Sequence, residues 1–338
     1  MFNAEKQNDL AKAIQSNFPI DPRPYAVLAK QIGSDEEEII AQIKEWKDQC
    51  LLREVSAVME GSVLGYDSAL VCARIPKESL DRVTDIISEH PTVTHMYERR
   101  HHFNLWFTIA TPGDMILEKH IELLQNLTGA ERFYLLRRTL TFKIGITFDL
   151  ISKKNSTKKV KLNHSIPPIK INQENMRIIR VIQKDLPIMS RPFKTLAEEN
   201  DLYERDVIQF LKENVGKTVR RYVATFRHRN LGVKANGMVV WNISKDELEE
   251  KGQYLAHFPE VSHCYARTSF PDFPYSLYSM VHASTREELG DITRTIASGL
   301  DCDNYLIMES TKEFKKCRLR YFLPELEIWW ENHVKLIA

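Results

Sequence analysis

HPTVTHMYER, residues 90–99, returns as FPEVSHCYAR at residues 258–267, and this repeated stretch decides the fold. The same offset relates FPIDPRPYAVLA at 18–29 to LPIMSRPFKTLA at 186–197. Similar segments in one order and at one spacing indicate two copies of one domain architecture, fused in a single chain. Where the copies differ, we expect them to divide the chemistry of a site that they share.

Length and composition agree with two soluble copies. The chain has 338 residues, so each copy has roughly 150, a common size for a domain with its own core. Its apolar content of 43% and charged content of 28% are ordinary for a globular protein. The polar N-terminus MFNAEKQNDLAKAIQ and the lack of any long apolar run predict neither a secretion signal nor a membrane span.

The cysteines are odd in number and scattered, without CxxC spacing. This pattern argues against a disulfide framework and against a zinc site, and it favours a reducing cytoplasm. The five are Cys50, Cys72, Cys264, Cys302 and Cys317. A net charge of +1 gives the chain no general attraction to nucleic acid.

The first part of each copy is typical of a winged helix-turn-helix. Ser34 and Glu37 form a capping box for the third of three short helices, and a strand at 53–59 follows as the wing. The second copy repeats this order. Its predicted elements are helices at about 173–185, 191–199 and 203–213 and a strand at 219–227.

The rest of each copy predicts strands and helices in the order βαββαβ. This is the ferredoxin-like arrangement, in which two helices cover one face of an antiparallel sheet. In the first copy the predicted elements are strands at 68–75, 93–100, 103–111 and 132–144, with helices at 77–90 and about 112–128. The second copy repeats them between about 235 and 322.

The fold class is therefore α+β, a tandem duplication of a winged helix-turn-helix with a ferredoxin-like domain. We expect a linker rich in Lys, Ser and Pro between the copies. The predicted boundaries are 1–60 and 173–228 for the helix-turn-helix domains, 61–150 and 229–338 for the ferredoxin-like domains, and 151–172 for the linker.

A winged helix joined to a ferredoxin-like domain resembles the Lrp/AsnC family of transcription regulators, which makes DNA binding the first hypothesis. The third predicted helix argues against it, because acidic side chains would face the phosphates that supply most non-specific affinity. Residues 34–49 carry Asp35, Glu36, Glu37, Glu38, Glu45 and Asp48 against Lys44 and Lys47. We expect no DNA partner and infer that these helices pack the fused halves together.

Histidines and arginines gather in the repeated stretch. The first copy has His95, Arg99, Arg100, His101 and His102 in its predicted hairpin. The second copy has His263 and Arg267 at matching positions and adds Arg227, His228 and Arg229 before its sheet. Each copy therefore holds basic groups that the other lacks.

Imidazoles beside guanidinium groups suit a ligand with many carboxylates. Arginine binds carboxylates in a bidentate fashion, and histidine donates a proton or ligates iron. Tyr97 and Tyr265 alternate with His95 and His263 along their strands, so each pair shares a face. Nearby rings offer a floor for a flat ligand: Phe103, Trp106, Phe270, Phe273, Tyr275 and Tyr278. The alternative is that the basic residues are solvated and the rings are core.

The segment HPTVTHMYERRHHFNLWFTIAT from residue 90 closely resembles one subunit of siroheme decarboxylase. RHRNLGVKANGMVVWN from 227, with EVSHCYARTSFPDFPYSLYSMVH from 260, resembles the other subunit. The resemblance covers nearly the whole chain, which is similar to the fused members of that family. The family usually has an acidic residue where this chain has Arg100. His101 aligns with the family's hairpin histidine, and His102 is additional.

The resemblance implies a carboxy-lyase that removes the 12- and 18-acetate carboxyl groups of siroheme. The product, 12,18-didecarboxysiroheme, serves the synthesis of haem d1 or the alternative haem pathway. The implied catalytic residues are His228, His263, His95 and His101, with His263 or His95 as the axial ligand of the substrate iron. The implied substrate-binding residues are Arg99, Arg227, Arg229, Arg267, Tyr97 and Tyr265. No cofactor is expected beyond the iron that siroheme carries.

Two other functions remain open from the residues alone. A ligand-sensing Lrp/AsnC-like regulator would need a basic recognition helix, whereas a non-catalytic tetrapyrrole carrier would use the same pocket. We expect a cytoplasmic protein with siroheme as its partner and no contact with membranes. Pairing of two fused chains into a homodimer also remains open.

Overall fold

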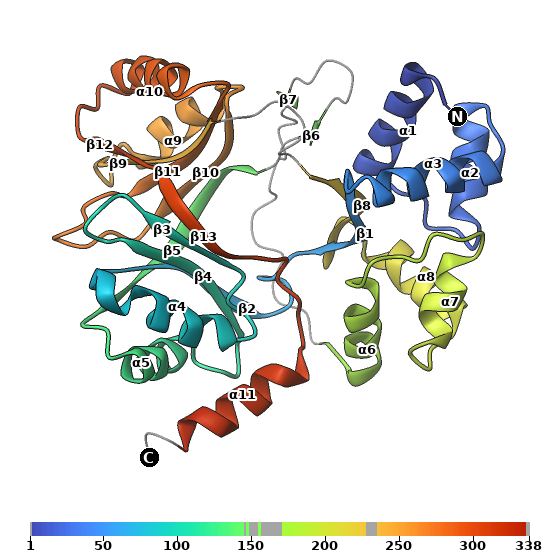
Figure 1. The fold of residues 1–338 in the computed structure, drawn as a ribbon, viewed down its shortest axis with the longest axis horizontal. Coiled ribbons are helices and arrows are strands. Elements are labelled where there is room, and N and C mark those ends of the chain that lie inside the picture. Colours follow the sequence, from blue (N-terminus) through green and yellow to red (C-terminus); the bar gives the residue numbers. More distant parts are fainter. Residues whose placement is uncertain (1, 145–146, 149–154, 157–170, 228–234, 336–338) are drawn as a thin grey trace. The chain divides into compact units, whose positions relative to one another are not determined.

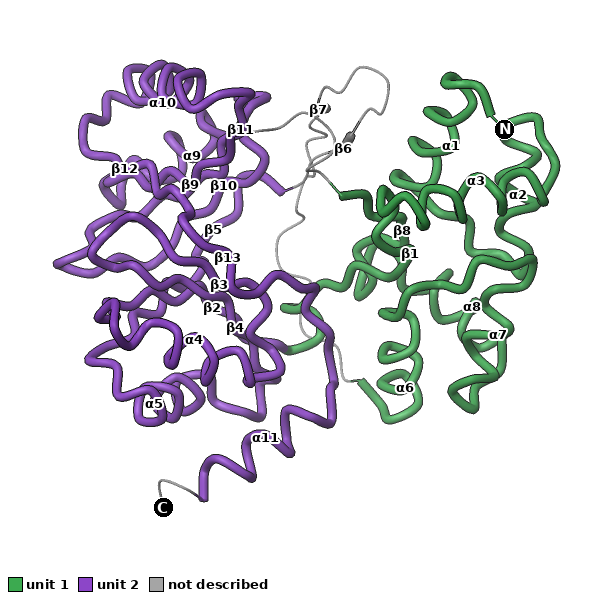
Figure 2. Tube along the Cα trace, viewed as in Figure 1, with its two compact units in different colours: residues 1–65, 147–156, 163–232 green, residues 66–146, 157–162, 233–338 purple. Residues whose placement is uncertain are grey.

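The computed structural model describes residues 2–144, 147–148, 155–156, 171–227 and 235–335. The chain divides into two compact units, and each copy contributes to both (Figure 2). Unit 1 comprises residues 1–65, 147–156 and 163–232, and unit 2 comprises residues 66–146, 157–162 and 233–338. The domain boundaries inferred from the sequence stay predictions, and the expected linker at 151–172 lies almost entirely outside the described residues.

Unit 1 contains both helix-turn-helix modules (Figure 1). The first copy supplies α1 (Ala4–Ser16), α2 (Pro24–Ile32), α3 (Glu36–Asp48) and β1 (Leu52–Met59). The second copy supplies α6 (Gln173–Ile182), α7 (Pro192–Glu198), α8 (Glu204–Asn214) and β8 (Val219–Phe226). The short strands β6 (Thr147–Phe148) and β7 (Asn155–Ser156) pair with each other. The Asp35 side chain accepts a hydrogen bond from the Glu38 N–H and so begins α3.

The two helix-turn-helix modules pack against each other within unit 1. Strands β1 and β8 form an antiparallel ladder with Val55 opposite Ala224, so each wing pairs with the wing of the other copy. The buried ring of Tyr222 contacts Phe18 of the first copy at 6.0 Å and Phe193 of the second at 5.6 Å between centroids. This shared core confirms the inference that these helices hold the halves together.

Unit 2 contains both ferredoxin-like modules, each with the predicted order βαββαβ. The first copy supplies β2 (Tyr66–Ala73), η1 (Lys77–Ser79), α4 (Leu80–Glu89), β3 (His95–Arg99), β4 (Leu105–Pro112), α5 (Leu117–Thr128) and β5 (Phe133–Ile144). The second copy supplies β9 (Ala235–Trp241), α9 (Leu248–Ala256), β10 (Val261–Arg267), β11 (Leu277–Ala283), α10 (Arg286–Leu300), β12 (Tyr305–Met308) and β13 (Ser310–Lys316). A further helix, α11 (Pro324–Val334), has no counterpart in the sequence prediction.

Among the described residues, the strands of unit 2 join in one nine-stranded antiparallel sheet with the order β12-β9-β11-β10-β5-β2-β4-β3-β13. The last strand region of each copy pairs at its beginning with a strand of its own copy and further along the chain with a strand of the other copy. Strand β5 passes from β2 to β10, and β13 pairs with β3 after β12 has paired with β9. Because only Glu309 separates β12 from β13, the chain runs directly from one end of this order to the other.

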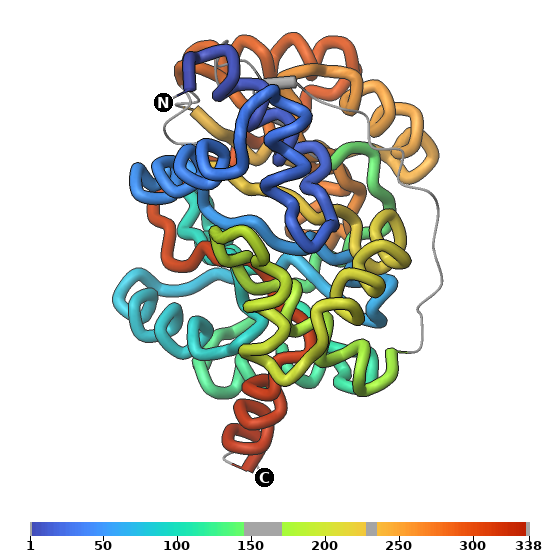
Figure 3. Tube along the Cα trace, turned by 90° about the vertical axis from the view of Figure 1, so that its right-hand side faces the viewer, coloured from blue at the N-terminus to red at the C-terminus, as the bar shows by residue number. Residues whose placement is uncertain are grey.

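The sheet separates three hydrophobic clusters. One lies under α4 and α5 and another under α9 and α10, so each helix pair covers the outer face of one half of the sheet (Figures 1 and 3). The third fills the inner face, between the two halves of the sheet, and draws residues from both copies, including Trp106, Leu136 and Tyr278. Strand residues therefore alternate between a helix-side core and the inner face.

Helix α11 covers a buried pair of histidines beside the first copy's helices. His90 Nε2 and His120 Nδ1 lie 3.0 Å apart, and both side chains are buried. The Trp329 ring lies 4.3 Å from that of His90 and stacks on His120 at 6.0 Å. Burial lowers the pKa of His120 to about 4. Burial, followed by the neighbouring His120, Lys315 and His333, holds the pKa of His90 well below its ordinary value.

This pair should make unit 2 sensitive to acid. The unfolded chain takes up protons below about pH 6.5, whereas folded His120 resists protonation until about pH 4, so stability is lost as the pH falls through this window. For His120 alone, lowering the pH from 7 to 5 should remove about 2 kcal/mol from the free energy of unfolding. Urea unfolding followed by tryptophan fluorescence measures it. His120→Asn should lose less stability on acidification, and His257→Asn, at an exposed position, should behave like the unaltered chain. Equal acid sensitivity in all three proteins would contradict the assignment.

Candidate functional site

Strands β3 and β10 present the same three side chains on the inner face of the sheet. Met96 and Cys264, in the middle of these strands, belong to the helix-side cores. The residues that alternate with them, His95, Tyr97 and Arg99 in β3 and His263, Tyr265 and Arg267 in β10, therefore face inward. The prediction that each histidine shares a face with its tyrosine is confirmed. The ring centroids lie 6.4 Å apart in the first copy and 6.1 Å apart in the second.

The two inner faces differ in the strand that lies alongside. In the first copy β13 places Lys316 opposite His95, Glu313 opposite Tyr97 and Ser310 opposite Arg99. In the second copy β5 places Ile144 opposite His263, Thr141 opposite Tyr265 and Arg138 opposite Arg267. The first face therefore carries a carboxylate beside its tyrosine, whereas the second carries an additional arginine and no acid at these positions.

The two inward arginines hold equivalent bonds but differ in exposure. Arg99 Nη1 donates to the Met308 carbonyl at 2.5 Å, and Arg267 Nη1 donates to the Leu136 carbonyl at 2.9 Å. Arg99 is 8% exposed and burial lowers its pKa to about 10, whereas Arg267 is half-buried, and burial lowers its pKa too. The Nε atom of each is buried without a hydrogen-bond partner. Such a donor is satisfied when a ligand supplies an acceptor.

Arg138 and Arg267 converge on one tyrosine. Their guanidinium carbons lie 5.9 Å and 5.3 Å from the centre of the Tyr265 ring, and Arg267 also lies 5.6 Å from that of Tyr278. Arg138 contributes to the lowered pKa of Arg267 because the two like charges repel each other. Two cations on one ring make this face attractive to carboxylates.

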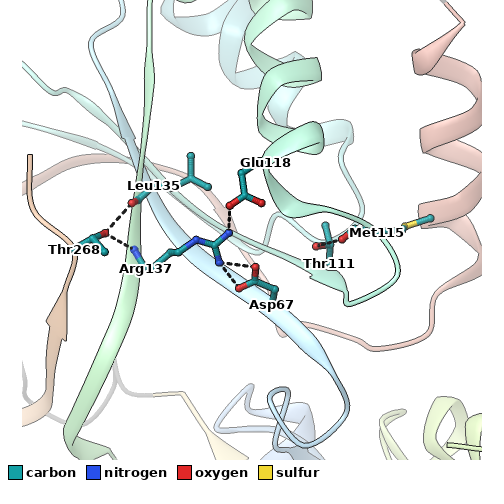
Figure 4. A network of polar contacts seen from close by, with 7 residues as sticks. All are labelled: Asp67, Thr111, Met115, Glu118, Leu135, Arg137 and Thr268. Atoms are coloured by element: carbon teal, nitrogen blue, oxygen red, sulfur yellow. Dashed lines mark hydrogen bonds and ion pairs between the residues drawn. The ribbon is translucent and has the colours of Figure 1, made fainter. Parts of the chain in front are cut away.

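A clamp fixes the register that brings Arg138 to Arg267 (Figure 4). On the helix side, the Arg137 guanidinium bonds Asp67 and Glu118. Because side chains alternate along a strand, Arg138, the next residue of β5, points inward. Beyond β10, the Thr268 hydroxyl donates to the Leu135 carbonyl and accepts from the Arg137 N–H, both at 3.0 Å. The end of β10 is thereby bonded to the strand of the other copy.

The two inward histidines have different hydrogen-bond partners. His95 Nδ1 lies 3.0 Å from the Thr94 hydroxyl, which lies 2.9 Å from that of Thr108. His263 Nδ1 lies 2.8 Å from the Ser262 hydroxyl, which in turn lies 2.6 Å from Nε2 of His282. Each imidazole is thus held at Nδ1, which leaves Nε2 as the nitrogen directed away from that anchor.

His101 lies beyond Arg99, in the turn between β3 and β4. Its Nδ1 accepts a hydrogen bond from the Phe103 N–H at 3.1 Å, and its ring lies 4.0 Å from His102 and 5.8 Å from Phe273. Burial, followed by the neighbouring His102, lowers the pKa of His101 to about 4. At about 3.3 Å per residue, β3 separates this turn from His95 by more than about 13 Å.

Comparison with known proteins identifies both kinds of module. The siroheme decarboxylase NirDL-like HTH domain matches residues 8–53 and 175–218, and the AsnC-like ligand binding domain matches residues 63–143 and 230–315. The siroheme decarboxylase of Hydrogenobacter thermophilus is 33% identical over 325 residues, which cover 96% of this chain and 97% of that one. The chain belongs to the siroheme decarboxylase family.

Solved structures agree with this assignment. The siroheme decarboxylase NirDL in co-complex with an iron-uroporphyrin III analogue is 30% identical, with a TM-score of 0.80 over 98% of this chain and 100% of that one. The siroheme decarboxylase beta subunit of Methanosarcina barkeri is 36% identical over 152 residues, which are 44% of this chain and 99% of that subunit. The family thus includes a separate subunit that matches less than half of this chain, which is a fused form.

The remaining candidate residues of this siroheme decarboxylase family member fall in several places. Phe103, Trp106, Phe273, Tyr275 and Tyr278 are buried in the inner-face cluster, so these rings are core, as the alternative reading held. Arg227 is exposed at the end of β8 in unit 1, where its N–H donates to the Leu51 carbonyl at 2.9 Å. His228 and Arg229 lie outside the described residues.

A hollow in unit 1 is a poorer candidate. It has a volume of about 450 Å³ and is lined by Lys44, Lys47, Asp48, Asp185, Leu186, Pro187 and Ile188. Lys47 is paired with Asp185, and the lining contains neither histidine nor arginine. Within the described ranges, no cluster of three or more His, Cys, Asp or Glu side chains is arranged to hold a metal ion. The same residues include no helix long and apolar enough to cross a membrane.

Proposed function

We propose that this chain decarboxylates siroheme at its 12- and 18-acetates and releases 12,18-didecarboxysiroheme. The observation that carries the proposal is the second copy's inner face, with His263, Tyr265, Arg267 and Arg138 in a chain of this family. An iron-uroporphyrin III analogue, another iron tetrapyrrole, is bound in the solved structure of a relative.

The reaction needs a positioned carboxylate and a proton. The bond between the acetate methylene and its carboxylate breaks, CO₂ leaves, and the electron pair enters the conjugated macrocycle. A proton then adds to the methylene carbon and forms a methyl group, so one proton is consumed for each CO₂ released. An imidazole supplies that proton, and guanidinium groups hold the other carboxylates and orient the reacting acetate.

In this proposal the second copy provides the working face. His263 delivers the proton or ligates the substrate's iron, and Tyr265 supports Arg267 and Arg138, which bind carboxylates. Arg227, His228 and Arg229 remain candidate binding and catalytic residues on the grounds of the sequence alone. The ligand's own conjugated ring accepts the electron pair, so the reaction requires no added cofactor.

The first copy's face is the weaker one. Its counterparts His95, Tyr97 and Arg99 lie beside Glu313 and Lys316, which pair at 3.7 Å and add no net charge, whereas Arg138 adds a positive charge to the second face. His95 remains the second candidate for the axial ligand, and His101 remains a candidate acid at the hairpin. We infer that this face contributes contacts or is a degenerate second site.

Arg138 gives the charge argument a direct test. Arg138→Ser, which installs the residue found at the equivalent position beside the first face (Ser310, opposite Arg99), should weaken siroheme binding about fivefold. An exposed charge near a carboxylate contributes about 1 kcal/mol. The matched control is Ser310→Ala on the first face, which should bind normally. Anaerobic titration of the siroheme absorbance measures both, and equal affinities in the two variants would remove Arg138 from the site.

Turnover separates this function from the two alternatives. Purified chain incubated with siroheme under anaerobic conditions should give products that have lost one and then two CO₂, detected by mass spectrometry. Binding without loss of CO₂ would establish a tetrapyrrole carrier. Siroheme-dependent binding of DNA would establish a regulator.

The five cysteines are without disulfides in the structure, and we place the chain in the cytoplasm on that basis.

A further inference from the structure

A line of polar side chains crosses the inner face of the second copy from β10 to β9. The Ser262 hydroxyl lies 2.8 Å from His263 Nδ1 and 2.6 Å from His282 Nε2. His282 Nδ1 in turn lies 2.5 Å from the side-chain oxygen of Asn236, its cross-strand neighbour. Ser262 is buried, His282 is half-buried and Asn236 is exposed. The line therefore connects His263, the proposed acid, with the surface of the protein.

The protons of this line can be placed in order from its outer end. The Asn236 oxygen only accepts, so neutral His282 carries its proton on Nδ1 and accepts at Nε2. The Ser262 hydroxyl then donates to His282, in preference to the Met280 carbonyl at 3.5 Å. With that proton committed, the Ser262 oxygen accepts from His263, whose neutral ring must hold its proton on Nδ1.

The first copy lacks the outer part of this line. Tyr97 is paired with Trp106 and Tyr265 with Tyr278, which makes Ala110 the counterpart of His282. Ser68, opposite Ala110, takes the place of Asn236. Beside His95 Nδ1 lies the Thr94 hydroxyl, followed by that of Thr108, and either of these hydroxyls can donate to the other. The line in the second copy, by contrast, fixes which group donates in each hydrogen bond.

We propose that Ser262, His282 and Asn236 are positioning residues that hold neutral His263 as its Nδ1–H tautomer. The tautomer makes Nε2 the nitrogen that meets the ligand, either to ligate the iron of siroheme through its lone pair or, after taking up a proton from solvent to form the imidazolium, to pass that proton to the substrate carbon. This role rests on the proposed function. The tautomer itself does not, because the hydrogen bonds exist in the chain without a ligand.

Nitrogen-15 NMR on ligand-free protein labelled at histidine reads the tautomer directly. At about pH 8, well above the ordinary histidine pKa of about 6.5, two-bond proton–nitrogen spectra should show His263 with a protonated Nδ1 and an unprotonated Nε2. The His263→Gln variant identifies its signals. Asn236→Asp keeps an acceptor and should keep the tautomer. Ser262→Ala should give a mixture, and Ser68→Ala, in the first copy, should leave the His263 signals unchanged.

Kinetics then test the role in turnover. Ser262→Ala and Asn236→Ala should each lower kcat on the order of 10-fold with little change in KM, the usual loss for residues that orient a functional histidine. Ser262→Thr, which installs the residue of the first copy, should restore the rate. His263 signals with a protonated Nε2, or signals unaltered by Ser262→Ala, would overturn the tautomer. An Nδ1–H tautomer in a chain that releases no CO₂ would leave the tautomer standing and refute the proposed function.

Discussion

Replacing His263 with alanine should lower the single-turnover rate of decarboxylation by about 10²–10⁴-fold, the usual contribution of a positioned general acid. His95→Ala should reduce it only a few-fold. The two imidazoles occupy equivalent positions on the inner face, but Ile144 lies opposite His263 and Lys316 lies opposite His95. Glu313 is paired with Lys316 and leaves the first face without added net charge, whereas Arg138 adds a positive charge to the second face and favours a polyanionic substrate there.

The comparison needs two further proteins. His102→Ala should keep full activity, because His102 is exposed in the hairpin turn. The double variant of His95 and His263 should be inactive and should still show the unaltered chain's near-ultraviolet circular dichroism. Full activity in the double variant would remove both from the mechanism. A dead His95→Ala protein beside a normal His263→Ala protein would assign the working face to the first copy.

The Arg267→Ala variant should bind siroheme at least about tenfold more weakly. A buried bond between a guanidinium and a carboxylate contributes about 1.5–3 kcal/mol, which corresponds to about 10- to 150-fold in affinity. Arg267 is suited to this role because its Nε is buried without a partner while part of the side chain stays exposed. Titration of siroheme under anaerobic conditions measures the dissociation constant.

Two comparisons separate binding from folding. Arg267→Lys keeps the charge but loses the bidentate geometry, so its affinity should fall between those of the unaltered chain and the alanine variant. Arg99→Ala removes the equivalent bond to a strand carbonyl on the first face and should destabilise the fold similarly while affecting siroheme less. Equal losses of affinity in the two alanine variants would show that both faces bind the substrate.

The elements of this fold follow from local sequence, but the pairing of copies does not. The alternation of apolar residues places helices and strands close to their observed bounds. The capping box predicted at Ser34 and Glu37 was wrong by one residue, because the Asp35 side chain caps α3 at the Glu38 N–H. Strands β1, β5 and β13 each pair with a strand of the other copy, and no local periodicity identifies a partner so distant. Helix α11 escaped prediction because it lies beyond the repeated region.

The candidate site was predictable to the same degree. Repetition of His, Tyr and Arg at alternate positions identified the inward residues of β3 and β10. Arg138 was missed because it belongs to the first copy's sequence and meets the second copy's face only through the register of β5 and β10. A basic residue late in the strand of one copy, with serine at the equivalent place in the other, was the available signal. The prediction that the nearby rings form a floor for a flat ligand was wrong in part, because several of these rings are buried in the inner-face cluster and large rings also build cores.

The pairing of β13 with β3 also has a consequence for biosynthesis. As the ribosome releases the first copy, β3 has hydrogen-bonding groups along one edge that stay unpaired until residues 310–316 have been made. An unpaired edge is a template for aggregation, and contacts between residues far apart in sequence form slowly. The nascent chain must therefore protect this edge through the synthesis of some 200 further residues. A fused gene keeps the missing strand on the same polypeptide, where it need not find the edge by diffusion.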